Sequence, residues 1–211
     1  MRNTININCG WLFSKEAKSV PANLNKDWEK VDLPHTWNGT DGQDGGNDYY
    51  RGKCYYAKEL KSEDFPAGEE YYIQFDAVNS SAEIFFNGEK LCTHHGGYSA
   101  FRVKLDHIQT ENLLVVAADN SPNDFVYPQQ ADFTFYGGIY RGVKLIGVPA
   151  THFDLDYFGA PGISVTPIVS AGKADITVNA YLSQESKVKF EILDADGNSV
   201  CSVTAFGTSA Q

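Results

Sequence analysis

The sequence predicts an all-β chain that folds as a β-sandwich or barrel. Short strand-like runs recur at roughly 8–12-residue spacing, with turn residues between them. Helical apolar periodicity of ten or more residues does not occur, although an α/β fold would need such patterns between its strands. Aromatic residues make up 13% of the 211 residues, and aromatic rings pack well on pleated sheets.

The first 150 residues contain most of the predicted strands. Asn87-Gly88 separates two of these runs and is the strongest short hairpin signal in the sequence. The stretch 38–48 is rich in Gly, Asp and Asn and predicts a long loop, of the kind that is often functional. The predicted strands are 4–8, an aromatic-rich piece at 10–14, then 28–33, 54–60, 70–77, 82–86, 89–93, 101–105, 112–118 and 142–148.

The pattern changes near residue 150. Residues 151–158 are predicted as one strand, and apolar and polar residues then alternate along 174–182 and 187–192. An Asp-Gly turn ending at Gly197 leads into a return strand around 200–203. This pattern is typical of an antiparallel sheet with one wet face. An immunoglobulin-like sandwich takes about 100 residues. Residues 151–211 are too few for such a sandwich, so we expect two domains: 1–150, and a partial second domain at 151–211.

Composition and charge exclude several classes of protein. The net charge of −10 repels phosphate backbones and anionic lipid, so neither nucleic acid nor a membrane surface is an expected partner. No apolar run is long enough to span a membrane. The residues after Met1 show no apolar signal core, so the compartment stays open: cytoplasmic, or periplasmic or secreted if a signal was removed.

Four segments carry a resemblance to a known family. They are Leu-Pro-His-Thr-Trp-Asn at 33–38, Tyr-Arg-Gly at 50–52, Phe-Asn-Gly through His-Gly-Gly-Tyr to Phe at 86–101, and Ala-Asp-Phe-Thr-Phe-Tyr-Gly-Gly-Ile-Tyr-Arg at 131–141. In this order they resemble the family 2 glycoside hydrolases of the β-galactosidase and β-glucuronidase type. The tail resembles the start of the family's immunoglobulin-like domain. Gly142 departs from the family, whose members often carry an acidic residue there, and we expect a local salt bridge to be affected.

The resemblance implies a jelly-roll (galactose-binding-like) β-sandwich that binds sugar beside a catalytic TIM barrel, whose two glutamates perform a retaining reaction. A TIM barrel takes about 250 residues, so the chain is expected to be a non-catalytic N-terminal fragment, inactive alone. The favoured parent is a β-galactosidase acting on terminal β-galactosides, although β-glucuronidases share the same segments. The full-length protein could be a homo-oligomer. Two alternatives are a free-standing, lectin-like carbohydrate-binding module and a purely structural interaction domain.

Two residues are predicted to bind the sugar, and no catalytic residue, cofactor or metal site is expected. In the resembled enzymes the aspartate matching Asp132 reaches the sugar pocket and accepts a bond from a hydroxyl, which suits a charged acceptor. The alternative for Asp132 is a loop aspartate that caps a turn. The loop after Trp37 also contributes an asparagine there, which points to Asn38. The acidic residues of 38–48 do not follow the spacing of a calcium-binding loop.

Overall fold

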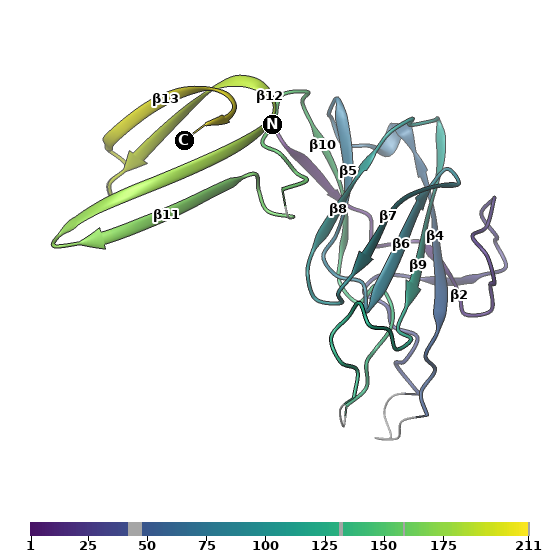
Figure 1. The fold of residues 1–211 in the computed structure, drawn as a ribbon. Helices are drawn as coiled ribbons and strands as arrows, with labels where there is room; N and C mark the ends of the chain where they lie inside the picture. The colour runs from purple at the N-terminus through teal and green to yellow at the C-terminus, as the bar shows by residue number, and fades with distance from the viewer. Residues whose placement is uncertain (42–47, 131–132, 158, 211) are drawn as a thin grey trace. The chain divides into compact units, whose positions relative to one another are not determined.

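The computed structural model describes residues 1–41, 48–130, 133–157 and 159–210. They fold as an all-β protein (Figure 1), which confirms the predicted fold class. Within these ranges the structure has a single 3-10 turn, Ser62–Asp64, and no helix that is long and apolar enough to cross a membrane. The chain divides into two compact units: Asn3–Gly147, and Met1–Arg2 with Val148–Gln211.

The first unit is a sandwich of two antiparallel sheets. Its six-stranded sheet contains, in spatial order, β3 (Glu29–Val31), β2 (Trp11–Ser14), β4 (Lys53–Lys61), β9 (Glu111–Asp119), β6 (Ser81–Phe86) and β7 (Glu89–His95). Its four-stranded sheet contains β1 (Asn3–Asn6), β10 (Val143–Val148), β5 (Glu70–Phe75) and β8 (Phe101–Leu105).

The core of this unit lies between the two sheets. Buried side chains from both sheets form one cluster, with Trp11, Tyr56 and Ile84 on one side and Ile73 and Phe75 on the other. Strand β6 shows the reason: every second residue turns inward, as the alternating sequence predicts. The hairpin between β6 and β7 turns at Asn-Gly as expected, and both turn residues have positive φ.

The second unit is a three-stranded sheet in the order β11 (Ile163–Ser170), β12 (Lys173–Leu193) and β13 (Ser199–Ala210). The strand predicted at 151–158 is wrong, because its described residues form only an isolated bridge from Phe153 to Leu182. Strand β11 was missed; Pro167 lies in the middle of it and breaks the alternation of apolar and polar residues that begins at Ile163. The two predicted runs 174–182 and 187–192 belong to one strand, β12, with an irregular stretch between them.

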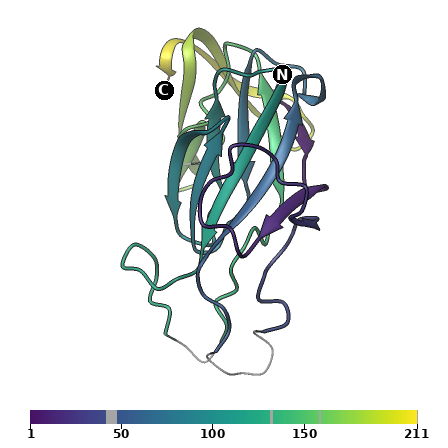
Figure 2. The same ribbon diagram turned by 90° about the vertical axis from the view of Figure 1, so that its right-hand side faces the viewer.

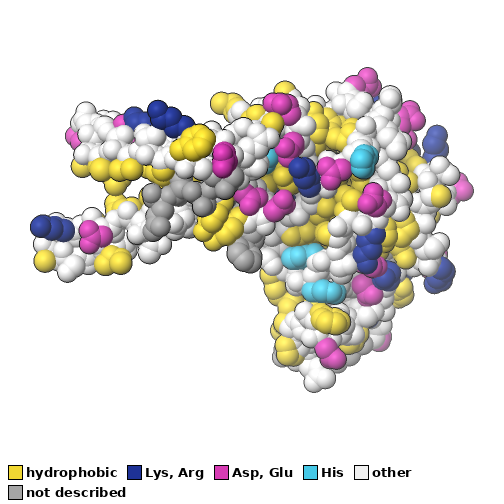
Figure 3. All heavy atoms as spheres, turned by 45° about the horizontal axis from the view of Figure 1, so that its top comes forward, with side chains coloured by type: hydrophobic (Ala, Val, Ile, Leu, Met, Phe, Trp, Pro, Cys, Tyr) yellow, Lys and Arg dark blue, Asp and Glu magenta, His cyan; other side chains and the backbone are white. Residues whose placement is uncertain are grey.

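The apolar side chains of this second sheet are only partly covered. Ala180 and Val188 are buried, whereas Val203 is 54% exposed and Phe206 is 71% exposed. Figure 3 shows hydrophobic side chains gathered along one side of the arm that these strands form. The expected antiparallel sheet is therefore present and its strands are paired, but many of its apolar side chains are exposed in this structure.

Candidate functional site

Two long loops of the first unit meet at one end of its sandwich. The first loop, 32–52, joins β3 to β4, and the second loop, 120–142, joins β9 to β10. Figure 2 shows both loops projecting from the same end of the unit. They hold three of the four segments on which the family resemblance rests, and both predicted sugar-binding residues. Loops longer than about 12–15 residues are often functional, so this end is the candidate site.

Asn38 lies completely buried between the two loops. Its Nδ2 donates to Asp41 Oδ1 (3.0 Å) and to the Tyr50 carbonyl (2.9 Å). Its Oδ1 accepts bonds from Asn120 Nδ2 (3.1 Å) and from the Gly137 amide (2.9 Å). A side-chain amide has two donors and two acceptor positions, and all four are used here. Asn38 therefore ties the loops to each other, and its predicted contact with sugar stays a prediction.

Asn120, at the end of β9, completes this link and was missed in the sequence. It is also fully buried, and its Nδ2 reaches the Phe135 carbonyl at 3.0 Å. Its Oδ1 accepts a bond from the Gly52 amide at 2.9 Å, and its backbone carbonyl accepts one from Arg51 Nε at 3.0 Å. Buried polar groups are costly unless they are bonded, so a fully satisfied pair of asparagines fixes one arrangement of the loops.

The segment 133–138 of the second loop is held at several further points. The Phe135 amide donates to Tyr49 Oη at 3.1 Å, and Thr36 Oγ1 donates to the Gly137 carbonyl at 2.7 Å. Gly137 packs so closely on Trp37 that a Cβ atom on it would lie 2.0 Å from Cζ2 of the indole. Only a glycine fits this contact, which gives the Gly-Gly pair in the sequence a packing explanation.

Asp132, the main predicted sugar ligand, lies outside the described residues, as do residues 42–47 of the first loop. Its role therefore stays a prediction. The chain is described again from Phe133, whose ring is 58% exposed. The contacts of Phe135 and Gly137 show that the polypeptide is anchored within a few residues after Asp132.

Four rings lie in contact across this end of the unit, and we call them the aromatic row: Tyr98, Tyr127, Phe135 and Phe133. Their successive centroid distances are 4.9, 6.0 and 4.9 Å. The first and last rings, Tyr98 and Phe133, are each 58% exposed, whereas the two rings between them are more covered. Burial, hydrogen bonding to Tyr98 and the neighbouring tyrosines raise the pKa of Tyr127 well above its usual range. The row is thus an uncharged aromatic surface in which the inner rings, Tyr127 and Phe135, are packed between the two exposed ones.

The histidines nearby have structural contacts. His35 Nδ1 lies 2.8 Å from Tyr56 Oη, and the ring of His94 stacks on Phe101 at a centroid distance of 4.0 Å. Burial lowers the pKa of both histidines, which favours their neutral forms. Within the described ranges, no three His, Cys, Asp or Glu side chains converge to hold a metal ion.

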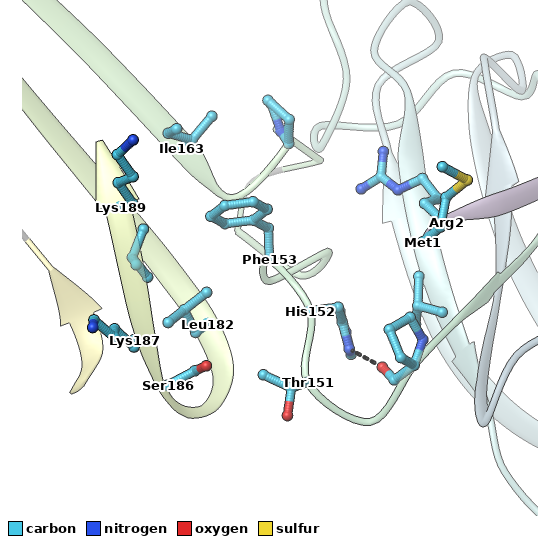
Figure 4. A pocket seen from close by; sticks show the side chains of 14 residues that line it. Met1, Arg2, Thr151, His152, Phe153, Ile163, Leu182, Ser186, Lys187 and Lys189 are labelled. Carbon is cyan, nitrogen blue, oxygen red and sulfur yellow. Dashed lines mark hydrogen bonds between the residues drawn. The ribbon is translucent and has the colours of Figure 1, made fainter. Parts of the chain in front are cut away.

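A separate hollow of about 650 Å³ lies in the second unit (Figure 4). Phe153, Ile163 and Leu182 line it, with Lys187 and Lys189 among the polar lining residues. The described residues that line it include no carboxylate. It therefore lacks, in the described part of the chain, the carboxyl pair that a retaining glycosidase needs.

Comparison with known proteins identifies the family. Residues 2–149 match the family described as "Glycosyl hydrolases family 2, sugar binding domain". The chain belongs to this family. It is 34% identical over 204 residues to a β-glucuronidase of Bacteroides fragilis, covering 93% of this chain and 28% of the relative. It is 27% identical over 220 residues to a β-galactosidase of Thermoanaerobacter pseudethanolicus, covering 95% and 28%.

A solved β-glucuronidase has the same fold. The crystal structure of an FMN-binding β-glucuronidase from Facaelibacterium prausnitzii L2-6 superposes with a TM-score of 0.83 at 36% identity. The match covers 100% of this chain and 33% of that protein. The chain spans about a quarter of the length of the curated relatives it matches (25% and 28% for two of them). The family 2 resemblance inferred from the four sequence segments is thereby confirmed.

Proposed function

We propose that this family 2 chain is the non-catalytic, sugar-binding part of a longer retaining β-glycosidase. In this proposal Asp132 reaches the substrate, and the catalytic carboxyl pair comes from a domain that this chain does not contain. The observation that carries the proposal is the anchoring of residues 133–137 by Asn38, Asn120 and Tyr49. A ligand group works best when its supporting residues hold it in place before the substrate binds.

The sugar is the finer part of the proposal. A β-galactoside was preferred from the sequence, although β-glucuronidases share the same four segments. The relative at 34% identity is named a β-glucuronidase, as is the solved structure at 36%. We therefore propose a β-glucuronide as the substrate of the whole enzyme. A β-galactoside is the second candidate, supported by the β-galactosidase at 27% identity.

A chimeric enzyme tests this role. Residues 1–211 would replace the matching region of the B. fragilis β-glucuronidase, and hydrolysis of 4-nitrophenyl β-glucuronide would be measured. We expect an active chimera, in which Asp132→Ala lowers kcat/KM by about tenfold to a hundredfold, the worth of one hydrogen bond to a charged group. Asp106→Ala, an exposed aspartate in the same unit, is the matched control. Equal activity of the two variants would contradict the role of Asp132.

Two further measurements separate the alternatives. A second chimera, with the Thermoanaerobacter β-galactosidase, should retain a smaller share of its parent's activity if the chain is adapted to a glucuronide. The isolated 211-residue chain should hydrolyse neither substrate and should give little heat on titration with galactose or lactose, because too few groups converge without the catalytic domain. Saturable binding of these sugars that is lost in Asp132→Ala would favour a free-standing carbohydrate-binding module.

A further inference from the structure

Tyr98, at one end of the aromatic row, is an exposed ring that the protein already holds in place. Its ring stacks on Tyr127 with an interplanar angle of 27°, and Tyr127 Oη donates to Asn79 Oδ1 at 2.6 Å. The preceding residue, Gly97, packs against that asparagine so tightly that a Cβ would lie 2.1 Å from Oδ1. A ring that is fixed before binding loses little conformational entropy when a ligand stacks on it.

Arg141 places a positive charge beside the backbone of Tyr98 and against the ring of the neighbouring Tyr140. Its Nη1 donates to the Tyr98 carbonyl at 3.2 Å, and its guanidinium carbon lies 5.4 Å from the ring centroid of Tyr140. Arg141 is exposed, and it forms no ion pair with any carboxylate in the described part of the chain. One hydrogen bond and one ring contact leave most of its five N–H donors available to a ligand.

Asp76, the carboxylate on which the charge of Arg141 acts, already forms an ion pair with another residue, Lys144. Asp76 Oδ2 lies 2.7 Å from Lys144 Nζ, and its Oδ1 accepts a bond from Gln74 Nε2 at 2.7 Å. Burial alone would raise the pKa of Asp76, but the bonds from Lys144 and Gln74, together with the charges of Lys144 and Arg141, lower it overall. The next residue along the chain, Gly142, adds no carboxylate. Among the described residues, Arg141 therefore acts on Asp76 only through its charge and forms no ion pair, in a chain whose net charge is −10.

The exposed ring of Tyr98 and a guanidinium bonded to the backbone of the same residue, with no ion pair among the described residues, together define a class of ligand. The C–H face of a sugar covers an aromatic ring, and a guanidinium binds a carboxylate through two parallel hydrogen bonds. A neutral sugar would offer the guanidinium only hydroxyl acceptors, which form weaker hydrogen bonds than a carboxylate does. A polyanion such as nucleic acid would be repelled by the net charge of the chain.

We propose that Tyr98 and Arg141 form a second carbohydrate-binding site, one that takes a sugar unit carrying a carboxylate, such as a uronic acid. The site goes beyond the proposed function, because it uses neither Asp132 nor a catalytic domain. It lies at the Tyr98 end of the aromatic row, whereas Asp132 precedes Phe133 in sequence at the other end. The 211-residue chain alone should therefore bind such a sugar.

Titration of the ¹⁵N-labelled chain, followed by NMR, tests the site with two sugars that differ in one group. Methyl β-glucuronide carries a carboxylate where methyl β-glucoside carries a hydroxymethyl group. We expect the glucuronide to shift the amide signals of Tyr98, Tyr127 and Arg141, and to bind about three- to tenfold more tightly than the glucoside. Arg141→Gln should remove this preference, and Tyr98→Ala should weaken binding of both sugars about tenfold.

Control variants keep the outcome decisive. Tyr98→Phe retains the ring and should bind as the unchanged chain does. Lys26→Gln removes an exposed positive charge elsewhere in the unit and should leave binding unchanged. Asp132→Ala should also bind normally, and a loss there would move binding to the proposed substrate position and overturn this second site. Three other results would also overturn the site. They are equal affinity for both sugars, no signal shifts at Tyr98 and Arg141, and tighter binding of a phosphate compound, uridine monophosphate, than of the glucuronide.

Discussion

Replacing Asn38 by alanine should destabilise the first unit strongly, because the side chain bonds to both long loops. The substitution removes four hydrogen bonds with lengths of 2.9–3.1 Å. The Tyr50 carbonyl keeps weaker contacts with Trp37 Nε1 (3.4 Å) and Asn120 Nδ2 (3.5 Å). The buried Gly137 amide loses the acceptor described for it. One orphaned buried donor costs about 1–3 kcal/mol and each other lost bond about 0.5–1.5, which together give about 2.5–7.5 kcal/mol. Because the Tyr50 carbonyl keeps two weaker contacts, we expect a loss in the lower part of this range, about 3–4 kcal/mol.

Unfolding in urea, followed by tryptophan fluorescence, measures this loss. All three tryptophans, Trp11, Trp28 and Trp37, lie within Asn3–Gly147, so the signal reports on the first unit alone. For a domain of this size, 1 kcal/mol corresponds to about 2–4 °C, so the melting temperature should fall by about 6–15 °C. Asn23→Ala, at an exposed position in the same unit, is the control and should change stability by less than about 0.5 kcal/mol.

The result also separates two readings of Asn38. If its side chain served chiefly to bind sugar, the alanine variant would lose affinity for substrate in the chimeric enzyme while the unit unfolded normally. A loss of stability below about 1 kcal/mol would therefore refute the reasoning, since it would mean that water or a rearranged loop satisfies the groups left behind.

Three further changes test other parts of the structure. Gly137→Ala should destabilise the first unit by several kcal/mol, because its Cβ would overlap Trp37, whereas Gly39→Ala, whose nearest contact would be 3.7 Å away, should be tolerated; thermal unfolding compares them. Trypsin should cut the second unit first and leave a product near the mass of the first, as mass spectrometry would show, because few of its described side chains are buried. Burial lowers the folded-state pKa of His35 below 6.5, so its stabilising contribution is present above pH 6.5 and is lost as the pH falls through the folded pKa. The urea midpoint of unfolding should therefore decrease less between pH 7.5 and pH 5.5 in His35→Gln than in the unchanged chain. His94, whose pKa is also lowered, supplies part of the decrease that remains.

The sequence predicted the first unit well because its strands are amphipathic and its turns carry strong signals. Strand β6 alternates cleanly, and the Asn-Gly turn after it fixes the register of the hairpin. In the second unit the same rules failed at two points. Pro167 hid strand β11, and the apolar residues of 151–158 suggested a strand that is only an isolated bridge. Periodicity shows that a segment has an apolar side, but it does not show which neighbour pairs with it.

The candidate site was harder to predict, because its main supports are long-range polar contacts. Asn38 attracted attention only through the family resemblance, and the two partners that tie it to the second loop are 82 and 99 residues away along the chain. Asn120 had no distinguishing signal, since an asparagine at the end of a strand is usually read as a turn residue. Neither composition nor spacing can show that two asparagines meet in a buried position, so the link between the loops became visible only in three dimensions.

Under the proposed function, the buried position of Asn38 and Asn120 would also explain how this domain affects a reaction performed by another domain. A displacement of about 1 Å in a substrate-binding group can cost about a hundredfold in rate. Residue 132 is carried by a 23-residue loop, 120–142, which by itself would allow such displacements. The bonds at Phe135 and Gly137 fix that loop to the first one, close in sequence after the residue proposed to bind substrate. The same bonds stabilise the fold, so a variant at Asn38 should lose stability and, in the chimeric enzyme, kcat/KM together, whereas a variant at Asp132 should lose kcat/KM alone.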